Sequence, residues 1–287
     1  MNHGLFLRAT LGLALILGAG TGFGQAQETR PVPTDDELKK GADLLPVGDY
    51  RDIDPMPLVG KYQGLRVTDV VDAMQAIGLQ DIGSMHHDIK PLWRDQTPAL
   101  SHRIYGVAVT AQYVPTNMRM SEMPLDEFRR WHSHWYQNYA PEAFTRVIRP
   151  GTVVVIDAHG TGNVGFIGSN NALRWKSLGM AGVVTNAGAR DTDEIILEKI
   201  PVYCAYVSHG TRPGRIETAS INKPVSVGGA LVRPGDMIVA DGDGVVVVPR
   251  EHGERVAEIA WDVAKGDKEG RRKLYQKMDM PLDETVK

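Results

Sequence analysis

Short apolar runs alternate with amphipathic stretches through the second half of this chain. The run GTVVVIDA, which begins at Gly151, has the β-branched residues typical of a strand, and residues Gly168 to Leu178 predict a helix. The run GVVT predicts another strand, and residues 191–198 predict a short helix before the apolar run PVYCAYV. Glycine-rich hairpins and a closing helix from Arg250 to Lys265 complete the pattern. Strands that alternate with helices predict an α/β layered domain.

The first half of the chain is less regular. Helical spacing of apolar residues predicts a helix from Thr68 to Ile77, and alternation predicts a strand from Arg103 to Val114. Residues 115–145, dense in Met, Trp, Tyr and His, are expected to form a helical insertion. An amphipathic helix that packs its aromatic side chains on the domain is the first interpretation. A lid or a wall of a binding site is the alternative.

The first 26 residues predict a secretory signal peptide. Arg8 is their only charged side chain, an apolar stretch runs from Ala9 to about Gly20, and the small residues Gly24 and Ala26 precede the expected cleavage point. An uncleaved membrane anchor is the alternative, but the apolar stretch is short for a spanning helix. We therefore expect a periplasmic or secreted protein that is free of the membrane after cleavage.

The rest of the chain is expected to have three parts. Residues 27–66 predict an N-terminal arm, because the sequence from Glu28 to Asp54 is polar, punctuated by proline and without a clear period. Residues 67–265 are expected to form the folded domain that contains the insertion. Residues 266–287 are expected to be a C-terminal tail.

Charge and cysteine content narrow the class of function. Removal of Arg8 with the leader changes the formal net charge from −3 to −4, and the chain has no basic block. This composition argues against a nucleic-acid partner. The single cysteine, Cys204, lies in an apolar run and is expected to be a small core residue.

Opposite charges follow the run GVVT after three small residues that would let a ligand approach the backbone. Arg190 offers a planar fork suited to a carboxylate. Asp191 and Glu194 are three apart at a helix start, can face the same side, and suit Mg²⁺ or Mn²⁺. The alternative is a surface ion pair of little consequence. Upstream, residues 168–171 (Gly-Ser-Asn-Asn) open another helix, whose free amides are able to hold an anion.

Other polar clusters are weaker candidates. Neither of the two histidine pairs has the spacing of a metal site: His86 and His87 are adjacent, and His132 and His134 are two apart on a helix. Aspartates next to glycines near the C-terminal hairpins are expected to build turns; they are Asp236, Asp241 and Asp243. The loop SHGTRPGRIE carries His209, Arg212 and Arg215, which could meet a substrate carboxylate, although solvated loop charges are commoner.

The run GSNNALRWKSLGMAGVVTNAGARDTDE resembles the RraA-like family, which includes the 4-hydroxy-4-methyl-2-oxoglutarate / 4-carboxy-4-hydroxy-2-oxoadipate aldolases. The stretches VVDAMQAIG, RIYGVAVT, RPGTVVVID and PGDMIVADGDGVVVVP agree with the family in the same order. The resemblance covers about Val67 to Ala264 and is interrupted by the insertion. It implies a swivelling β/β/α domain and a homotrimer or a dimer of trimers, with sites between subunits.

The resemblance also implies roles for individual residues. Arg190 matches the family arginine that holds the pyruvoyl part of the substrate, and Asp191 and Glu194 match its metal-bearing acidic residues. Amides at the helix start, at Ser169, Asn170 and Asn171, would bind the carboxylate of a 2-oxo acid. The family usually has an acidic residue 21 positions before the arginine, where this chain has Ser169. The residue that transfers the proton is therefore not identified by the resemblance.

The activity so implied is that of a divalent-metal-dependent carbon–carbon lyase. It would cleave a 4-hydroxy-2-oxo acid to pyruvate in a retro-aldol reaction, with oxaloacetate decarboxylation as a side activity. A lyase acting on an exported sugar-acid or aromatic breakdown product is one alternative. A non-catalytic RraA-like binding protein is the other, because the family's namesake inhibits an RNA-degrading enzyme.

The leader generates the first testable prediction. If residues 1–26 are cleaved, the mature chain begins near Gln27. Intact-mass measurement of protein recovered from the periplasm of an expressing bacterium checks this. Recovery of a chain that retains Met1 to Ala26 would contradict it.

Overall fold

The computed structural model describes residues 32–45, 48, 50, 52–158 and 160–287. The predicted signal peptide lies outside these residues. The chain divides between residues 46 and 47 into two compact units, and the first contains one described helix, α1 (Asp35–Lys40). Thr34 caps this helix: its hydroxyl accepts a hydrogen bond from the Glu37 amide, and the Glu37 carboxylate accepts one from the Thr34 amide.

An eight-stranded mixed sheet forms the centre of the second unit. Its strands are β1 (Lys90–Pro91), β2 (Ile104–Pro115), β3 (Thr152–Asp157), β5 (Met180–Thr185), β7 (Val202–Cys204), β9 (Ile216–Ile221), β12 (Met237–Asp241) and β13 (Gly244–Val248). They lie in the order β1-β7-β5-β3-β2-β12-β13, and β9 pairs with β2. β2, β3, β5 and β7 are parallel, and the remaining pairs are antiparallel.

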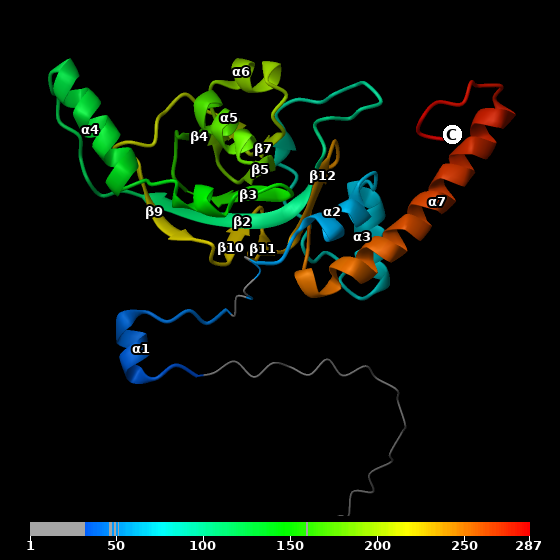
Figure 1. Cartoon of the computed structure of the whole chain (residues 1–287), viewed down its shortest axis with the longest axis horizontal. Coiled ribbons are helices and arrows are strands. Elements are labelled where there is room, and N and C mark those ends of the chain that lie inside the picture. The colour runs from blue at the N-terminus through cyan, green and yellow to red at the C-terminus, as the bar shows by residue number, and fades with distance from the viewer. Residues whose placement is uncertain (1–31, 46–47, 49, 51, 159) are drawn as a thin grey trace, which may run out of the picture. The chain divides into compact units, whose positions relative to one another are not determined.

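Two smaller sheets flank the main one. β4 (Gly165–Ile167), β6 (Gly188–Ala189) and β8 (Tyr206–Val207) form a parallel three-stranded sheet, and β10 (Val225–Val227) pairs with β11 (Ala230–Val232) as a hairpin. The helices α5 (Ser169–Ser177) and α6 (Thr192–Leu197) lie on one side of the main sheet, and the hairpin lies on the other (Figure 1).

The central strands are buried on both faces. In β3, Val154 and Ile156 pack in one core cluster with Trp175 of α5, whereas Val153 and Val155 pack in another with the β10–β11 hairpin. Successive side chains of a strand point to opposite faces, so a strand covered on both sides needs apolar residues at every position. This explains the unbroken apolar run that predicted β3.

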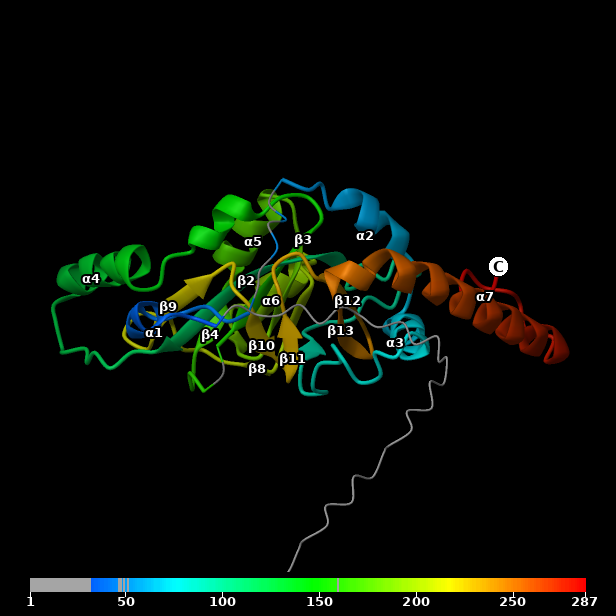
Figure 2. The same cartoon turned by 90° about the horizontal axis from the view of Figure 1, so that it is seen from below.

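Three helices cover the β12–β13 end of the sheet (Figures 1 and 2): α2 (Met56–Tyr62), α3 (Val67–Ala76) and α7 (Gly253–Lys277). The buried Tyr62 hydroxyl donates a 2.6 Å hydrogen bond to the Gly253 carbonyl, which joins α2 to the start of α7. Asp241 at the end of β12 accepts a 2.9 Å hydrogen bond from the Val67 amide and so fixes the start of α3. The short 3-10 helices are Ala143–Val147 and Arg250–His252.

The structure differs from the expected arm and tail. Within the predicted arm, α2 buries Leu58, Val59 and Tyr62 in the core, so this part belongs to the folded unit. Within the predicted tail, α7 continues to Lys277 instead of ending near Lys265. The extension is largely polar and carries ion pairs such as Lys273 with Glu269 at 2.8 Å. It therefore lacks the apolar period from which the helix was predicted.

Two further differences concern strands near the C-terminal side. The run PVYCAYV is not one strand: β7 joins the main sheet, and β8 joins the three-stranded sheet. Residues 216–221 form β9 along β2, although the first two of them, Ile216 and Glu217, fall in the stretch expected to be a loop. The change of sheet at Ala205 places β8 beside β6.

The insertion forms the helix α4 (Leu125–Asn138) at the opposite end of the sheet from α7 (Figures 1 and 2). Its aromatic residues recur at helical spacing on one face, and the buried Trp135 indole donates a 2.9 Å hydrogen bond to the Ile216 carbonyl. Ring contacts join Trp131 to Trp135 and Trp135 to Tyr139. The helix therefore packs through its aromatic stripe, which is the first of the two interpretations above.

A buried ion pair holds the end of the insertion. The Arg212 guanidinium is 1% exposed and lies 2.7 Å from the Glu142 carboxylate, while its other nitrogens donate to the Phe166 carbonyl at 3.0 and 2.6 Å. The Glu142 carboxylate also accepts hydrogen bonds from the side chains of Asn171 and Trp175 of α5. Burial alone would lower the pKa of Arg212, but the charges around it outweigh burial and raise that pKa, so the guanidinium stays charged. Arg212 is therefore not a solvated loop charge.

The polar residues near the hairpins have structural roles, as the sequence indicated. Asp236 accepts hydrogen bonds from the amides of Arg233 and Arg250, at 2.7 and 3.0 Å, and Asp241 accepts one from Asp243 at 2.8 Å. Cys204 is buried, which raises the pKa of its thiol to about 11. A buried, protonated thiol behaves as a small core residue.

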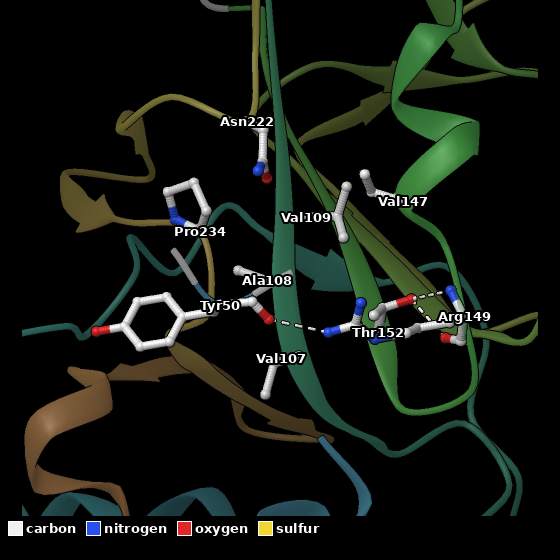
Figure 3. Close-up of a pocket in the computed structure, with 10 residues that line it drawn as sticks. Tyr50, Val107, Ala108, Val109, Val147, Arg149, Thr152, Asn222 and Pro234 are labelled. Atoms are coloured by element: carbon white, nitrogen blue, oxygen red, sulfur yellow. Dashed lines mark hydrogen bonds between the residues drawn. The ribbon is translucent and has the colours of Figure 1, made fainter. Parts of the chain in front are cut away.

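A small hollow of about 30 Å³ lies beside β2 (Figure 3). Arg149 at its edge donates hydrogen bonds to the carbonyls of Tyr50 and Ile53, at 3.0 and 2.8 Å, and so ties the segment before α2 to the start of β3. The Tyr50 ring covers Gly235, where an added Cβ would lie 2.4 Å from the ring. The hollow has room for about one water molecule and not for a substrate.

Among the described residues, no helix is both long and apolar enough to cross a membrane.

The buried ion pair generates a stability prediction. Glu142→Gln removes the negative charge beside Arg212 and leaves a buried cation, which costs about 3–5 kcal/mol of unfolding free energy. Urea denaturation at a fixed protein concentration measures this loss. Glu127→Gln, at an exposed position of α4, is the matched control and should change stability by less than about 0.5 kcal/mol. Equal midpoints for the two variants would show that the pair is dispensable.

Candidate functional site

The parallel pairing of β4, β6 and β8 gathers the segments that follow these strands. Gly188 and Ala189 of β6 pair with β4 on one side and with β8 on the other. Carboxyl ends of parallel strands meet at one edge of a sheet, which is where ligands bind in many α/β proteins. At this edge, Arg190 follows β6, the start of α5 follows β4, and Ser208 follows β8.

A left-handed residue turns the chain directly after the arginine. Asp191 has φ 52° and ψ 44°, a conformation that few residues other than glycine, asparagine and aspartate adopt. Its carboxylate is thereby aimed at the start of α5, where it accepts a 3.3 Å hydrogen bond from the Ser169 amide. It also accepts a 3.1 Å hydrogen bond from the Arg190 Nε. Among the described residues, the two terminal nitrogens of Arg190 have no hydrogen-bond partner, so they are available to a ligand.

Two glycines make room for this pair. A Cβ on Gly168 would lie 2.7 Å from the Asp191 carboxylate, and a Cβ on Gly165 would lie 2.6 Å from the Cβ of Arg190. Real Cβ atoms do not approach other atoms so closely, so a larger residue at either position would displace the charged side chain. The small residues of the β4 segment are thus required for the placement of Arg190 and Asp191.

The charged pair opens into a pocket of about 280 Å³. The pocket is lined by Arg190, Asp191, Val207, Ser208 and His209. The side chains of Arg190 and Asp191 are 31% and 35% exposed, so both reach solvent while their backbones are held by the sheet. The pair is therefore partly exposed but fixed in geometry, unlike a loose surface ion pair.

The insertion reaches the first turn of α5, where the Glu142 carboxylate binds the Asn171 side chain. Burial lowers the pKa of His132 on α4, and the positive charge of Arg190 lowers it further. The described residues that line the pocket include none from α4, in keeping with the packing role of its aromatic stripe.

The structure brings some of the predicted site residues together. Ser169 and Asp191 are in hydrogen-bond contact, so the Ser169 amide is occupied by a carboxylate of the chain itself. The backbone amides of Asn170 and Asn171 lie in the first turn of α5, and the Asn171 side chain binds Glu142. Glu194 is exposed in the first turn of α6. The described part of the chain gives its carboxylate no hydrogen bond or ion pair.

The donors at this edge fit a hard divalent ion. Asp191 presents a carboxylate to the pocket, and Mg²⁺ is commonly held by one or two carboxylates with the remaining positions filled by water. Asp191 would hold such an ion, whereas Glu194, the second acidic residue predicted for it, lies in the first turn of α6 and does not line this pocket. Within the described ranges, three metal-ligating side chains come within 4.8 Å of one another only at His86, His87 and Asp88. These three are consecutive and exposed, and they remain a poor site for the reason given above.

Sequence reasoning gave little weight to the residues contributed by β8. Ser208 and His209 line the pocket, but the run PVYCAYV was read as one strand, so the edge where it ends was not located. Asn163, which contacts both residues, was not singled out. The parallel pairing of β6 with β8 brings these residues to the pocket, and this pairing is known only from the small sheet in the structure.

The RraA-like family model, described as Aldolase/RraA, matches residues 67–247, which is more than half of the chain. The chain belongs to the RraA-like family. The expected family and the α/β fold class, a swivelling β/β/α domain of the RraA-like type, are thereby confirmed.

Curated relatives match over part of their lengths. A protein of Halalkalibacterium halodurans, provisionally named a 4-hydroxy-4-methyl-2-oxoglutarate aldolase, is 36% identical over 113 residues, which are 39% of this chain and 52% of that protein. A protein of Deinococcus radiodurans with the same provisional name is 34% identical over 101 residues, 35% of this chain and 62% of that protein. Protein DlpA of Legionella pneumophila is 26% identical over 76% of this chain and 32% of its own length. The chain thus spans less than two thirds of each of these relatives.

Solved structures of low identity share the fold. Streptomyces coelicolor RraAS2, described as an unusual member of the RNase ES inhibitor RraA protein family, has a TM-score of 0.62 at 22% identity and covers 76% of this chain and 98% of its own. An uncharacterised protein of Pseudomonas syringae pv. tomato has a TM-score of 0.57 at 20% identity and covers 85% of this chain and 100% of its own. These likenesses concern the fold alone.

The glycine clearance generates a prediction for the candidate metal site. Gly168→Ala pushes the Asp191 carboxylate away from its position, and loss of such support typically weakens metal binding about 10- to 100-fold. Calorimetric titration with Mn²⁺ measures the change. Gly266→Ala in α7 has open space for its Cβ and should leave Mn²⁺ affinity unchanged. Wild-type affinity in Gly168→Ala would mean that Asp191 does not bind the ion.

Proposed function

We propose that this protein is a divalent-metal-dependent lyase that cleaves a carbon–carbon bond of a 2-oxo acid. The main reaction is the retro-aldol cleavage of a 4-hydroxy-2-oxo acid to pyruvate and a second carbonyl compound, and oxaloacetate decarboxylation accompanies it. The observation that carries the proposal is the sheet edge where Arg190 and Asp191 line a pocket and the start of α5 contacts Asp191. The aldolase names of the relatives support the reaction class.

Arg190 binds the substrate and stabilises the charge that develops on it. Its Nε is held by Asp191, which fixes the plane of the guanidinium and leaves the terminal nitrogens for the oxygens of the 2-oxo acid. As the carbon–carbon bond breaks, negative charge moves onto the keto oxygen of the pyruvyl part. A guanidinium that is already in place stabilises this charge without reorganisation.

The start of α5 provides the second substrate contact. The amides of Asn170 and Asn171 point out of the first helical turn, and the positive end of the helix dipole favours the substrate carboxylate there. Glu142 holds the Asn171 side chain, so the insertion positions this turn. Asp191 would hold the divalent ion, which supplies Lewis-acid polarisation of the 2-oxo group when bound.

The proposed setting follows from the predicted leader and the family. The mature protein acts in the periplasm or outside the cell, as a homotrimer or a dimer of trimers, on a small-molecule substrate. Serine at position 169 also favours a second candidate, a lyase of the same compartment acting on a sugar-acid or aromatic breakdown product. Absence of any pyruvate-forming activity would instead favour a non-catalytic binding protein.

A substrate panel tests the proposal. Purified mature protein is assayed for pyruvate release from 4-hydroxy-4-methyl-2-oxoglutarate, other 4-hydroxy-2-oxo acids and oxaloacetate. We expect release with Mg²⁺ or Mn²⁺ and its loss with a chelator. If no compound yields pyruvate with either ion, the assignment as a pyruvate-forming lyase is wrong.

We expect the replacements of Asp191 and of Arg190 to impair the reaction in different ways. Asp191→Ala should lose metal dependence and most turnover, because the ion supplies several kcal/mol of charge stabilisation. Arg190→Lys keeps the charge but loses the planar fork; loss of such a donor costs about 100- to 1000-fold in rate. Steady-state kinetics on folded, oligomeric variants measure both effects.

Exposed neighbours provide the controls for this pair. Asp193→Ala in α6 and Arg174→Lys in α5 make the same changes at exposed positions outside the pocket. Both should keep wild-type kinetics. Wild-type rates in Asp191→Ala and Arg190→Lys would place the active site elsewhere.

A further inference from the structure

Ser169 stands where relatives of this chain usually have an acidic residue, so the proposed reaction lacks an assigned proton-transfer group. Retro-aldol cleavage requires a base, because the 4-hydroxyl must lose its proton as the carbon–carbon bond breaks. A serine hydroxyl is a weak base without a partner that activates it. The Ser169 side chain has no hydrogen bond with any described residue, and its amide binds Asp191.

Among the described residues that line the pocket, one group is suited to this task. Its lining has a guanidinium, a carboxylate that already binds Arg190 and the Ser169 amide, a hydroxyl, an aliphatic side chain and the imidazole of His209. Arginine stays protonated in proteins. Imidazole is the side chain that takes up and releases protons most readily near neutral pH.

The loop that carries His209 is tied to the strand next to the site. The Gly165 amide donates a 2.9 Å hydrogen bond to the Gly210 carbonyl. A Cβ on Gly210 would lie 2.0 Å from the Asn163 carbonyl oxygen, so the two backbones are in close contact. His209 is therefore an exposed side chain on a fixed backbone.

Asn163 also orients the imidazole ring. Its side-chain amide lies 3.4 Å from the His209 Nε2 and accepts a hydrogen bond from the Ser208 hydroxyl. The amide nitrogen faces Nε2 while the amide oxygen accepts from Ser208, so Asn163 is held on one side and constrains the ring on the other. Orientation of the ring by a third group is a common feature of catalytic histidines.

We propose that His209 is the catalytic residue that transfers the proton in the reaction proposed above, and that it does the work of the acidic residue absent at Ser169. The neutral imidazole takes the proton of the 4-hydroxyl, and the O–H electron pair becomes the new carbonyl bond at C4. The C3–C4 bond breaks, and its electron pair forms the enolate of pyruvate beside Arg190. The imidazolium returns the proton to C3, which gives pyruvate and restores the neutral ring.

Among the described residues, His132 is another imidazole whose pKa the charge of Arg190 affects, but its surroundings differ. It is half-buried on α4 between the rings of Phe128 and Tyr136, at 5.6 and 5.1 Å between centroids, and it does not line the pocket. Burial and the charge of Arg190 both disfavour its protonated form. These contacts indicate a packing role for His132.

The two proposed activities separate the role of His209 from a structural one. Cleavage of 4-hydroxy-4-methyl-2-oxoglutarate needs removal of a hydroxyl proton, whereas oxaloacetate reaches the same enolate by loss of carbon dioxide. His209→Gln should therefore lower kcat for the aldol cleavage about 100- to 10,000-fold and lower kcat for the decarboxylation far less. A change that merely disturbed the pocket would lower both activities alike.

Further variants complete the test. His209→Ala should recover part of its aldol cleavage when free imidazole is added. His134→Gln, on the exposed side of α4, is the matched control and should retain both activities. Equal loss of both activities in His209→Gln, or a selective loss in His132→Gln alone, would overturn the assignment. If the wild type itself releases no pyruvate from either compound, the proposed function fails first, and this failure is distinct from the failure of His209.

Discussion

The buried guanidinium of Arg212 must be neutralised where it lies, and this requirement links four parts of the structure. Its donors reach the β4 carbonyl of Phe166, and its charge is balanced by Glu142 at the end of the insertion. The same carboxylate holds Asn171 and Trp175 of α5. An unpaired charge at this depth would cost several kcal/mol. The loop after β8, the insertion, β4 and α5 therefore hold their positions together.

This linkage explains how a site on a loop edge can be fixed. The three-stranded sheet is short, with two or three residues in each strand, and could not hold Arg190 by pairing alone. Glu142 and Arg212 brace its flanks, and the Arg190 amide donates to the Ile167 carbonyl at 2.8 Å within it. Catalytic groups need to be held within a fraction of an ångström, and sites on rigid elements achieve this better than free loops.

The parts of the fold that follow local periodicity could be predicted from the sequence. β3 is buried on both faces, and α3 has one apolar face, so each leaves a clear pattern. The division of PVYCAYV into β7 and β8 could not be predicted, because apolar character does not say which sheet a residue joins. The same holds for the extension of α7, whose polar residues are stabilised by ion pairs instead of burial.

The candidate site, too, could be predicted from the sequence only in part. Arg190 and Asp191 were identified because they are adjacent and follow small residues that the sequence displays. The pocket lining of Ser208 and His209 depends on two strands, β6 and β8, that lie side by side although their residues are 18 apart in sequence. Asp191 shows why geometry changes the chemistry as well as the location. It is a left-handed residue before α6 and directs its carboxylate to the Ser169 amide. The spacing of three residues therefore does not by itself place Asp191 and Glu194 on one helical face.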